Sequence, residues 1–132
     1  MSLINQLIAD EGLKLFPYKD TAGKITIGIG RNLDDNGISE DEVYLLCQND
    51  INRCELELMN NFIFYGLLST ERKEVLINMC FNLGISRLKR FKKMIICLEN
   101  GDYVGAAKEM KDSNWYHQVG DRADRLIKKM EE

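Results

Sequence analysis

The chain has 132 residues, of which 45% are hydrophobic and 30% charged, and its formal net charge is −3. This length and composition predict one compact globular domain with a sizeable core and exclude a disordered chain. No apolar run approaches the ~18 residues that a membrane span needs, and the N-terminus lacks the basic region of a secretory signal, so we expect cytoplasmic synthesis.

The first 30 residues predict a short helix followed by a hairpin. Residues 2–11 carry apolar side chains at helical spacing and Gly12 follows as a stop, which makes Glu11 the last helical residue. Residues 13–19 and 24–29 predict two strands, joined by a turn that begins with Asp20. Isoleucines alternate along the second strand, so Thr26 is expected on the opposite face, toward a cleft or solvent.

Two carboxyls and a hydroxyl therefore fall beside one predicted hairpin. A helix C-terminus favours the protonated form of a carboxyl such as Glu11, more so if it is partly buried, whereas a carboxylate in a polar turn, such as Asp20, stays ionised. Carboxyls held in such different states can cleave a glycosidic bond. Taken singly, Glu11 is better interpreted as a charged helix end, Asp20 as a turn former and Thr26 as an ordinary strand residue, and only their combination favours the catalytic interpretation.

A long helix is predicted after a turn-rich segment at residues 30–37. Ser39 and Glu42 form an S-x-x-E capping box, and Ile38 and Val43 are spaced as its hydrophobic staple. Apolar residues then recur at helical spacing to about Met59. The sequence therefore predicts a helix over residues 39–59.

The rest of the chain predicts helices only. Ser69 caps a helix over residues 70–83, ended by Gly84, whose apolar stripe marks it as the central core helix. Asn78 and Asn82 interrupt that stripe, either as solvent-facing residues or as contacts to sugar acetamido groups. Residues 85–132 predict short helices with breaks at residues 100–101 and 113–114, and Trp115 is expected in the core.

Charge is distributed unevenly along the chain. Residues 1–60 carry 5 Lys/Arg and 11 Asp/Glu, a net charge of −6, whereas residues 61–132 carry 13 and 10, a net charge of +3. A basic run contains five cations in seven residues: Arg87, Lys89, Arg90, Lys92 and Lys93. This run is either a solvated helix face or an attraction site for an anionic polymer such as peptidoglycan or nucleic acid.

No metal or cofactor site is predicted. The four cysteines have no metal-ligand spacing and lie in apolar helical patterns, so we expect buried free thiols at Cys47, Cys54, Cys80 and Cys97. His117 has no partner at metal-ligand or catalytic-triad spacing.

Several segments together resemble a known family. The segments DEGL at 10–13, YKDT at 18–21 and GKITIGIG at 23–30 resemble the active-site segment of the T-even phage lysozymes, glycoside hydrolase family twenty-four. INMCFNLG at 77–84 is similar to a helix of that family. Two alanines at 106–107, WY-x-Q at 115–118 and Arg122, Ala123 and Arg125 follow at the family's spacing, so the resemblance covers most of the chain.

The resemblance implies an α+β, mostly helical, lysozyme-like fold in a single domain, residues 1–132. A small β-hairpin lobe at 12–38 would be joined by a connecting helix at 39–59 to a helical lobe formed by 1–11 and 60–132. The implied activity is that of an endolysin, a muramidase that hydrolyses the β-1,4 bond between N-acetylmuramic acid and N-acetylglucosamine. Glu11 would be the acid, Asp20 would activate water or stabilise the developing cation, and Thr26 would position that water, with no metal or cofactor.

The resemblance also implies roles outside the hairpin. Phe81 and Asn82 would bind substrate, and Arg122 would pair with Glu11, with Asn78 as a further supporting residue. Arg31 stands where the family usually has histidine, and we expect it to pair with Asp50 and tie the β lobe to the connecting helix.

The implied setting is a phage lysis system. The protein would be made in the host cytoplasm, act as a monomer on the glycan strand of the cell wall, need a holin to reach it, and have no nucleic-acid partner.

Two alternatives stay open from the sequence. A lytic transglycosylase would cleave the same bond with one acid and no water, and a non-catalytic wall-binding or nucleic-acid-binding helical module would use the basic run.

Overall fold

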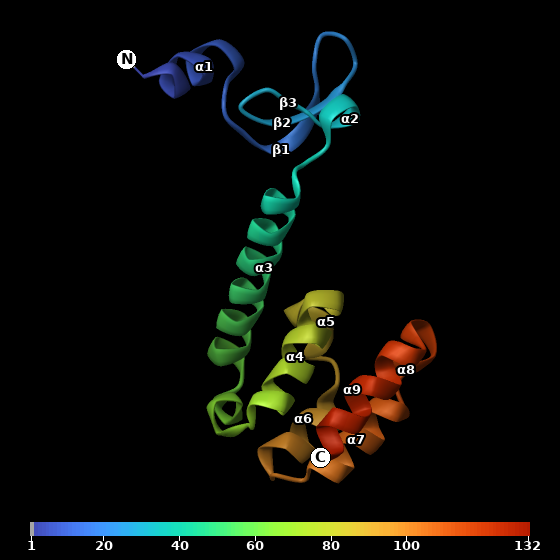
Figure 1. Cartoon of the computed structure of the whole chain (residues 1–132). Helices are drawn as coiled ribbons and strands as arrows, with labels where there is room; N and C mark the ends of the chain where they lie inside the picture. Colours follow the sequence, from blue (N-terminus) through green and yellow to red (C-terminus); the bar gives the residue numbers. More distant parts are fainter. Residues whose placement is uncertain (1) are drawn as a thin grey trace. The chain divides into compact units, whose positions relative to one another are not determined.

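The structure, a computed structural model, describes residues 2–132 and divides the chain into two compact units (Figure 1). The first, here called the sheet unit, reaches to Leu46, and the second, the helical unit, comprises Cys47–Glu132. The sheet unit holds a small antiparallel sheet and the rest of the described chain is mainly helical. This confirms the predicted α+β, mostly helical class. The assignment of residues 1–11 to the helical lobe stays a prediction.

The first helix, α1, spans Leu3–Glu11 and has the predicted ends. Ser2 caps it, since its hydroxyl accepts a hydrogen bond from the backbone N–H of Asn5 at 3.2 Å. Gly12 follows with φ of +81°, a conformation that glycine adopts without strain, and its N–H donates to the carbonyl of Ile8. Glu11 is therefore the last residue of α1, as predicted.

The sheet has the order β1-β2-β3 and is antiparallel throughout. It is formed by β1 (Lys14–Lys19), β2 (Ile25–Gly28) and β3 (Arg31–Asn32). Thr26 on the central strand pairs with Tyr18 on β1 and with Asn32 on β3. A four-residue helix, α2 (Leu33–Asn36), follows β3 and packs beside β2. The sequence predicted neither β3 nor α2.

The predicted capping box begins the long helix α3, which spans Glu40–Asn61. Ser39 Oγ accepts a hydrogen bond from the Glu42 N–H at 3.2 Å, and Glu42 Oε1 accepts one from the Ser39 N–H at 2.8 Å. Three acidic residues in the first turn add a favourable interaction with the helix dipole. These local bonds define where α3 begins.

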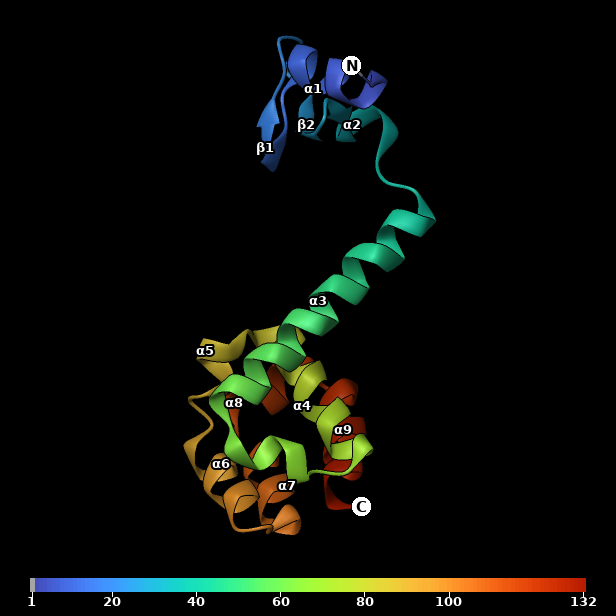
Figure 2. The ribbon, with the colours of Figure 1, turned by 90° about the vertical axis from the view of Figure 1, so that its left-hand side faces the viewer.

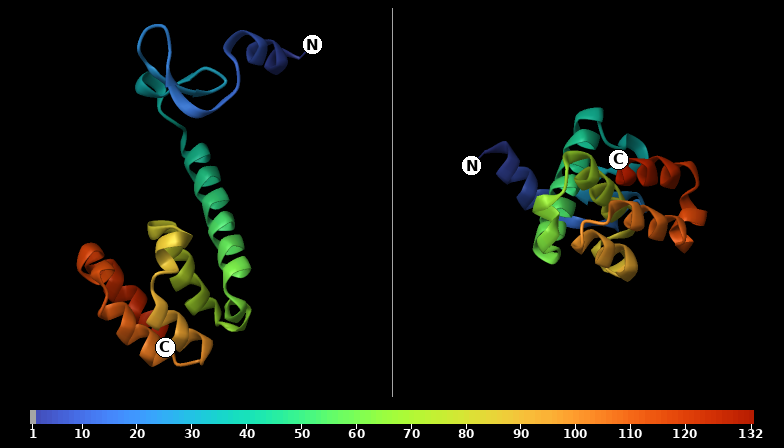
Figure 3. Two further views of the ribbon diagram at one scale, coloured as in Figure 1. Left: turned by 180° about the vertical axis from the view of Figure 1, so that it is seen from behind. Right: turned by 90° about the horizontal axis from the view of Figure 1, so that it is seen from below.

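The helical unit continues with one 3₁₀ helix and six α-helices. They are η1 (Ile63–Leu67), α4 (Thr70–Leu83), α5 (Ile85–Leu88), α6 (Lys92–Glu99), α7 (Tyr103–Lys111), α8 (Asn114–Val119) and α9 (Asp121–Glu131). Helix α7 packs against both α6 and α9, and the views in Figures 2 and 3 show these neighbours side by side. The breaks near residues 100 and 113 occur as predicted.

Helix α4 is the predicted core helix of the helical unit. Val75, Leu76, Met79 and Cys80 are each at most 2% exposed. Trp115 is also buried in this core, as expected. Arg72 at the start of α4 donates a 2.8 Å hydrogen bond to the carbonyl of Met130 in α9. Because backbone carbonyls at a helix end lack partners within the helix, this bond fastens the end of α9 to α4.

The four cysteines are free thiols, as predicted. Cys54 and Cys80 are buried, whereas Cys47 and Cys97 are only partly buried, so the expected burial holds for two of the four. Burial raises the pKa of the Cys80 thiol to about 12, which keeps it protonated and unreactive near neutral pH. Among residues 2–132, no helix is long and apolar enough to cross a membrane.

Candidate active site

Glu11 lies against Gly30, in the tight turn between β2 and β3. A β-carbon added to Gly30 would lie 2.9 Å from Glu11 Oε2 and 3.1 Å from Glu11 Cδ. Gly30 also has φ of +67°, which disfavours any other residue. Because Gly30 has no side chain, the end of α1 can approach the end of the hairpin closely at this point. Sequence reasoning did not single out Gly30, although its position after the predicted second strand indicates a residue with a special backbone requirement.

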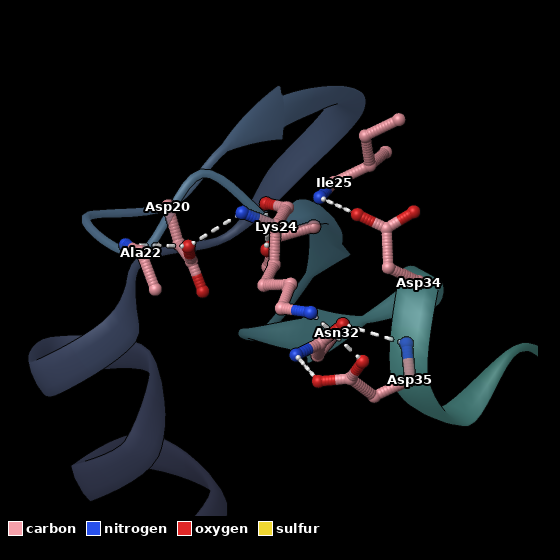
Figure 4. Close-up of polar contacts among 8 residues, drawn as sticks. Asp20, Ala22, Lys24, Ile25, Asn32, Asp34 and Asp35 are labelled. Carbon is pink, nitrogen blue, oxygen red and sulfur yellow. Dashed lines mark hydrogen bonds and ion pairs between the residues drawn. The ribbon is translucent and has the colours of Figure 1, made fainter.

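Asp20 is held rigidly at the β1–β2 turn. Its Oδ1 accepts hydrogen bonds from the backbone N–H groups of Ala22 and Lys24, both at 2.9 Å, as Figure 4 shows. This is the predicted Asx-type turn. Its Oδ2 has no hydrogen-bonding partner among the described residues. One oxygen thus fixes the carboxyl group, and the other is available to a ligand or a water molecule.

Thr26 is buried, with 2% of its surface exposed. The prediction that it faces a cleft or solvent is wrong, and the isoleucines on either side are the more exposed, Ile25 at 41%. Alternation along a strand separates two faces but does not say which face is covered. Burial is tolerated because Thr26 Oγ1 donates a 2.9 Å hydrogen bond to the carbonyl of Lys24, which leaves the oxygen's lone pairs as acceptors.

Helix α2 braces the central strand with its two aspartates, which sequence reasoning missed. Asp34 Oδ2 accepts a 2.8 Å hydrogen bond from the backbone N–H of Ile25. Asp35 accepts from Lys24 Nζ at 3.2 Å and from Asn32 Nδ2 at 2.9 Å, and these contacts lie together in Figure 4. The sequence signal that could have revealed α2 is Asn32, an N-cap residue, followed by two acidic residues in the first turn of the helix.

Arg31 has a different partner from the predicted one. Its Nη1 donates to Glu42 Oε1 at 2.8 Å and to the carbonyl of Gly37 at 3.1 Å. Asp50 pairs instead with Arg53, one turn along α3, at 2.9 Å. The expected pair of Arg31 and Asp50 stays a prediction, because the two residues belong to different units, and each has a partner within its own unit. Arg31 still ties the sheet to α3, through the capping box.

The Arg31 hydrogen bond has an electrostatic consequence for Glu42. This bond, together with the hydrogen bonds from Ser39, lowers the pKa of the Glu42 carboxyl to about 2. The carboxylate form that closes the capping box is therefore maintained well into acid.

The residues predicted in the helical unit divide between two surroundings. Asn78, Phe81 and Arg122 line a pocket of about 350 Å³, and Phe81 is 46% exposed. Arg122 Nε donates to Asn78 Oδ1 at 2.8 Å, so Asn78 orients the arginine. Asn82 lies one residue beyond Phe81, and its Oδ1 accepts a 3.2 Å hydrogen bond from Trp115 Nε1. Pairing of Arg122 with Glu11 and substrate contacts by Phe81 and Asn82 stay predictions.

Within the described part of the chain, no cluster of three His, Cys, Asp or Glu residues could hold a metal ion. The sheet unit offers groups for acid–base chemistry: an exposed carboxyl at a helix end, a fixed carboxyl with one open oxygen, and a hydroxyl with open acceptor positions.

Comparison with known proteins identifies relatives along nearly the whole chain. The family model "Phage lysozyme" matches residues 9–132. "Probable T4-type lysozyme 2" of Dictyostelium discoideum is 35% identical, over 96% of this chain and 91% of its own length. "Probable T4-type lysozyme 1" of the same organism is 32% identical, over 98% and 94%. "Pre-baseplate central spike protein Gp5" of Enterobacteria phage T4 is 28% identical, with 96% of this chain matching 27% of that protein.

Proposed function

The chain belongs to the phage lysozyme family and is a glycoside hydrolase acting on peptidoglycan, and on this basis we propose that it is a muramidase. Its target is the β-1,4 bond between N-acetylmuramic acid and N-acetylglucosamine. The observation that carries the proposal is the contact of Glu11 with Gly30, since it brings a carboxyl at the end of α1 to the end of the hairpin that also holds Asp20 and Thr26.

Glu11 is the proposed general acid. Its exposure allows it to reach the oxygen of a glycosidic bond in a bound strand, and a proton donated there makes the departing sugar a better leaving group. Gly30 supports this role, because the absence of a side chain there leaves the space in which the carboxyl lies. No metal ion is needed for this step.

Asp20 and Thr26 are the proposed water-handling pair. The open oxygen of Asp20, Oδ2, can accept a proton from water, and Thr26 Oγ1 can accept the second one because its own hydrogen is donated to Lys24. A water held by two acceptors presents its lone pair to the sugar. Inversion at the anomeric carbon then requires the two carboxyls to be ~6.5–9.5 Å apart, with the water between them.

We further propose the setting in which this activity is used. The chain would be made in the bacterial cytoplasm during phage lysis, work as a monomer, and reach the wall after a holin has permeabilised the membrane. Phe81 and Asn82 would bind the glycan strand, and Arg122 would support Glu11. The phage lysozyme family match supports this setting as a lysis enzyme.

Mass spectrometry of digested peptidoglycan tests the reaction. Purified sacculi are incubated with the protein and the muramic acid ends of the fragments are analysed. Reducing ends with one oxygen from labelled water are expected for hydrolysis. Anhydro ends would instead identify a lytic transglycosylase, and undigested sacculi would contradict both reactions. An Asp10→Asn variant serves as a control, because Asp10 is the exposed carboxyl next to Glu11.

A further inference from the structure

A second pocket, far larger than the one beside Phe81, lies wholly within the helical unit. Its volume is about 830 Å³, and we call it the basic pocket. Four of its lining residues come from the basic run identified in the sequence, and the others divide into polar and apolar groups. Its lining consists of the cations Arg87, Arg90, Lys92 and Lys93, the polar residues Glu109, Asp112, Ser113, Asn114 and Gln118, and the apolar residues Leu83, Phe91, Met94 and Trp115.

The four cations of the basic pocket have no protein partner among the described residues. No ion pair or side-chain hydrogen bond involves them, although Glu109 and Asp112 line the same pocket. All four are exposed. Like charges that line one pocket repel one another, so an anion that enters the pocket gains several favourable interactions at once.

The remaining lining favours a ligand that also carries hydroxyl groups. Glu109, Asp112 and the side-chain carbonyls of Asn114 and Gln118 are hydrogen-bond acceptors, which suit hydroxyl donors and disfavour a purely anionic molecule. Phe91 packs edge-on against Trp115, with ring centroids 6.2 Å apart, and contributes an apolar surface for carbon-bound hydrogens. Arginine side chains bind phosphate oxygens in bidentate fashion.

We propose that the basic pocket binds a segment of a sugar or polyol phosphate, such as the phosphodiester-linked polymers attached to some bacterial walls. The phosphate lies against Arg87 and Arg90, while the hydroxyls donate to the acceptors across the pocket. An isolated carboxylate would satisfy only one of the cations and none of the acceptors. This binding goes beyond the proposed muramidase activity and does not require cleavage, because all the residues involved lie in the helical unit.

Fluorescence offers a direct readout, since Trp115 is the only tryptophan of the chain and lines the pocket. The full-length Glu11→Gln variant is titrated with poly(glycerol phosphate), with polyglutamate of equal charge and with a single-stranded oligonucleotide. Poly(glycerol phosphate) is expected to change the emission at a concentration about tenfold lower than the other two. Equal responses to all three polymers would overturn the proposal, because they would reveal only non-specific attraction of anions.

Charge reversal then locates the binding. Arg87→Glu with Arg90→Glu should weaken binding of poly(glycerol phosphate) about tenfold or more, because two charge-assisted contacts are lost. The matched control, Arg125→Glu with Lys128→Glu, makes the same charge change on exposed cations of α9 outside the pocket and should change binding less than about twofold at 0.15 M salt. Equal losses in both variants would contradict a site at the basic pocket. Circular dichroism verifies that each variant is folded.

Binding to isolated walls shows whether the protein binds the phosphodiester-linked polymer or the peptidoglycan to which that polymer is attached. The Glu11→Gln variant is incubated with walls before and after removal of phosphodiester-linked polymers by cold hydrofluoric acid. Retention on untreated walls should fall several-fold after the treatment, and the loss should disappear in the Arg87→Glu, Arg90→Glu background. Unchanged retention on stripped walls would overturn the proposal and leave the muramidase assignment untouched.

Discussion

The two units of this protein are stabilised by different kinds of interaction. Every buried hydrophobic residue of the described chain lies between Cys54 and Met130, in the helical unit. In the sheet unit the only buried residue described is Thr26, which is polar, while Leu15 and Phe16 of β1 are about 80% exposed. The helical unit is therefore organised by apolar packing, whereas the sheet unit depends on hydrogen bonds, caps and glycine conformations.

This difference separates the chemistry from the core. Of the carboxyls proposed for catalysis, Asp20 is held by two backbone hydrogen bonds and Glu11 lies against Gly30, and neither lies in an apolar core. Substitutions in the sheet unit should therefore alter activity more than stability, and core substitutions in the helical unit should do the reverse. Substitutions in each unit test that contrast.

The largest effect is expected from Glu11→Gln. Glutamine keeps the shape of the side chain but cannot donate the proton, so the rate of wall digestion should fall by about 10²–10⁴. The free energy of unfolding should be unchanged or slightly higher, because the change removes a negative charge from a helix C-terminus. Turbidity of a sacculus suspension and urea unfolding measure the two quantities. The Asp10→Asn control should stay fully active, and rapid clearing by Glu11→Gln would contradict its role as the acid.

Met79→Ala should show the opposite pattern in the helical unit. Met79 is fully buried in α4, so its truncation leaves a cavity and should lower the free energy of unfolding by about 2–5 kcal/mol. The matched control is Met59→Ala in α3, where the side chain is 58% exposed and a change within about 0.5 kcal/mol is expected. Activity per folded molecule should be retained. Similar losses of stability in both variants would refute the packing argument.

Gly30→Ala should affect stability and activity together, and Gly23→Ala separates the two contributions. Both glycines have positive φ, so alanine should cost about 1–2 kcal/mol at either position. Only at Gly30 would the new methyl group collide with the Glu11 carboxyl. Displacement of the acid by about 1 Å should reduce activity by up to about 10²-fold, whereas Gly23→Ala should keep its activity. Equal activity of both variants would remove Gly30 from the site.

The same contrast explains what the sequence could predict. Helices α1, α3 and α4 were predicted close to their observed ends, because Ser2, Ser39 and Ser69 are side-chain caps and apolar residues recur over several turns. Strand β3 and helix α2 span two and four residues, too short for any periodicity to be read. Two of the elements beside the site, β3 and α2, were thus ones that periodicity could not reveal.

The candidate site was predictable in part. Glu11 and Asp20 were placed correctly, at a helix end and in a turn, because local chemistry decides both positions. The burial of Thr26 and the Arg31 contact were not predictable, because they depend on which face of a small sheet is covered and on which of several acids is nearest in space. Asp50 resembled the family's partner in sequence, but Glu42 is the residue that Arg31 contacts.

The smallest predicted effect concerns the pair of Arg31 and Glu42, which joins the sheet to the capping box of α3. The pKa of Glu42 is lowered from 4.5 to about 2, so its carboxylate stabilises the folded state. That contribution should be fully present above about pH 4.5, and it should be lost as the pH falls from there through about 2, because the folded chain must then take up the proton that the unfolded chain already holds.

A double-mutant cycle with Arg31→Ala and Glu42→Gln tests this pair by urea unfolding at pH 7 and at pH 2. A small favourable coupling free energy is expected at pH 7, since both side chains are solvent-accessible, and it should shrink at pH 2 as Glu42 becomes protonated. Arginine stays charged over this range, so the change must come from the carboxyl. The matched cycle of Arg31→Ala with Asp50→Asn measures, at the same two pH values, the coupling of the pair expected from the sequence. Coupling in the Asp50 cycle and none in the Glu42 cycle would reverse the assignment of the contact that anchors the sheet to α3.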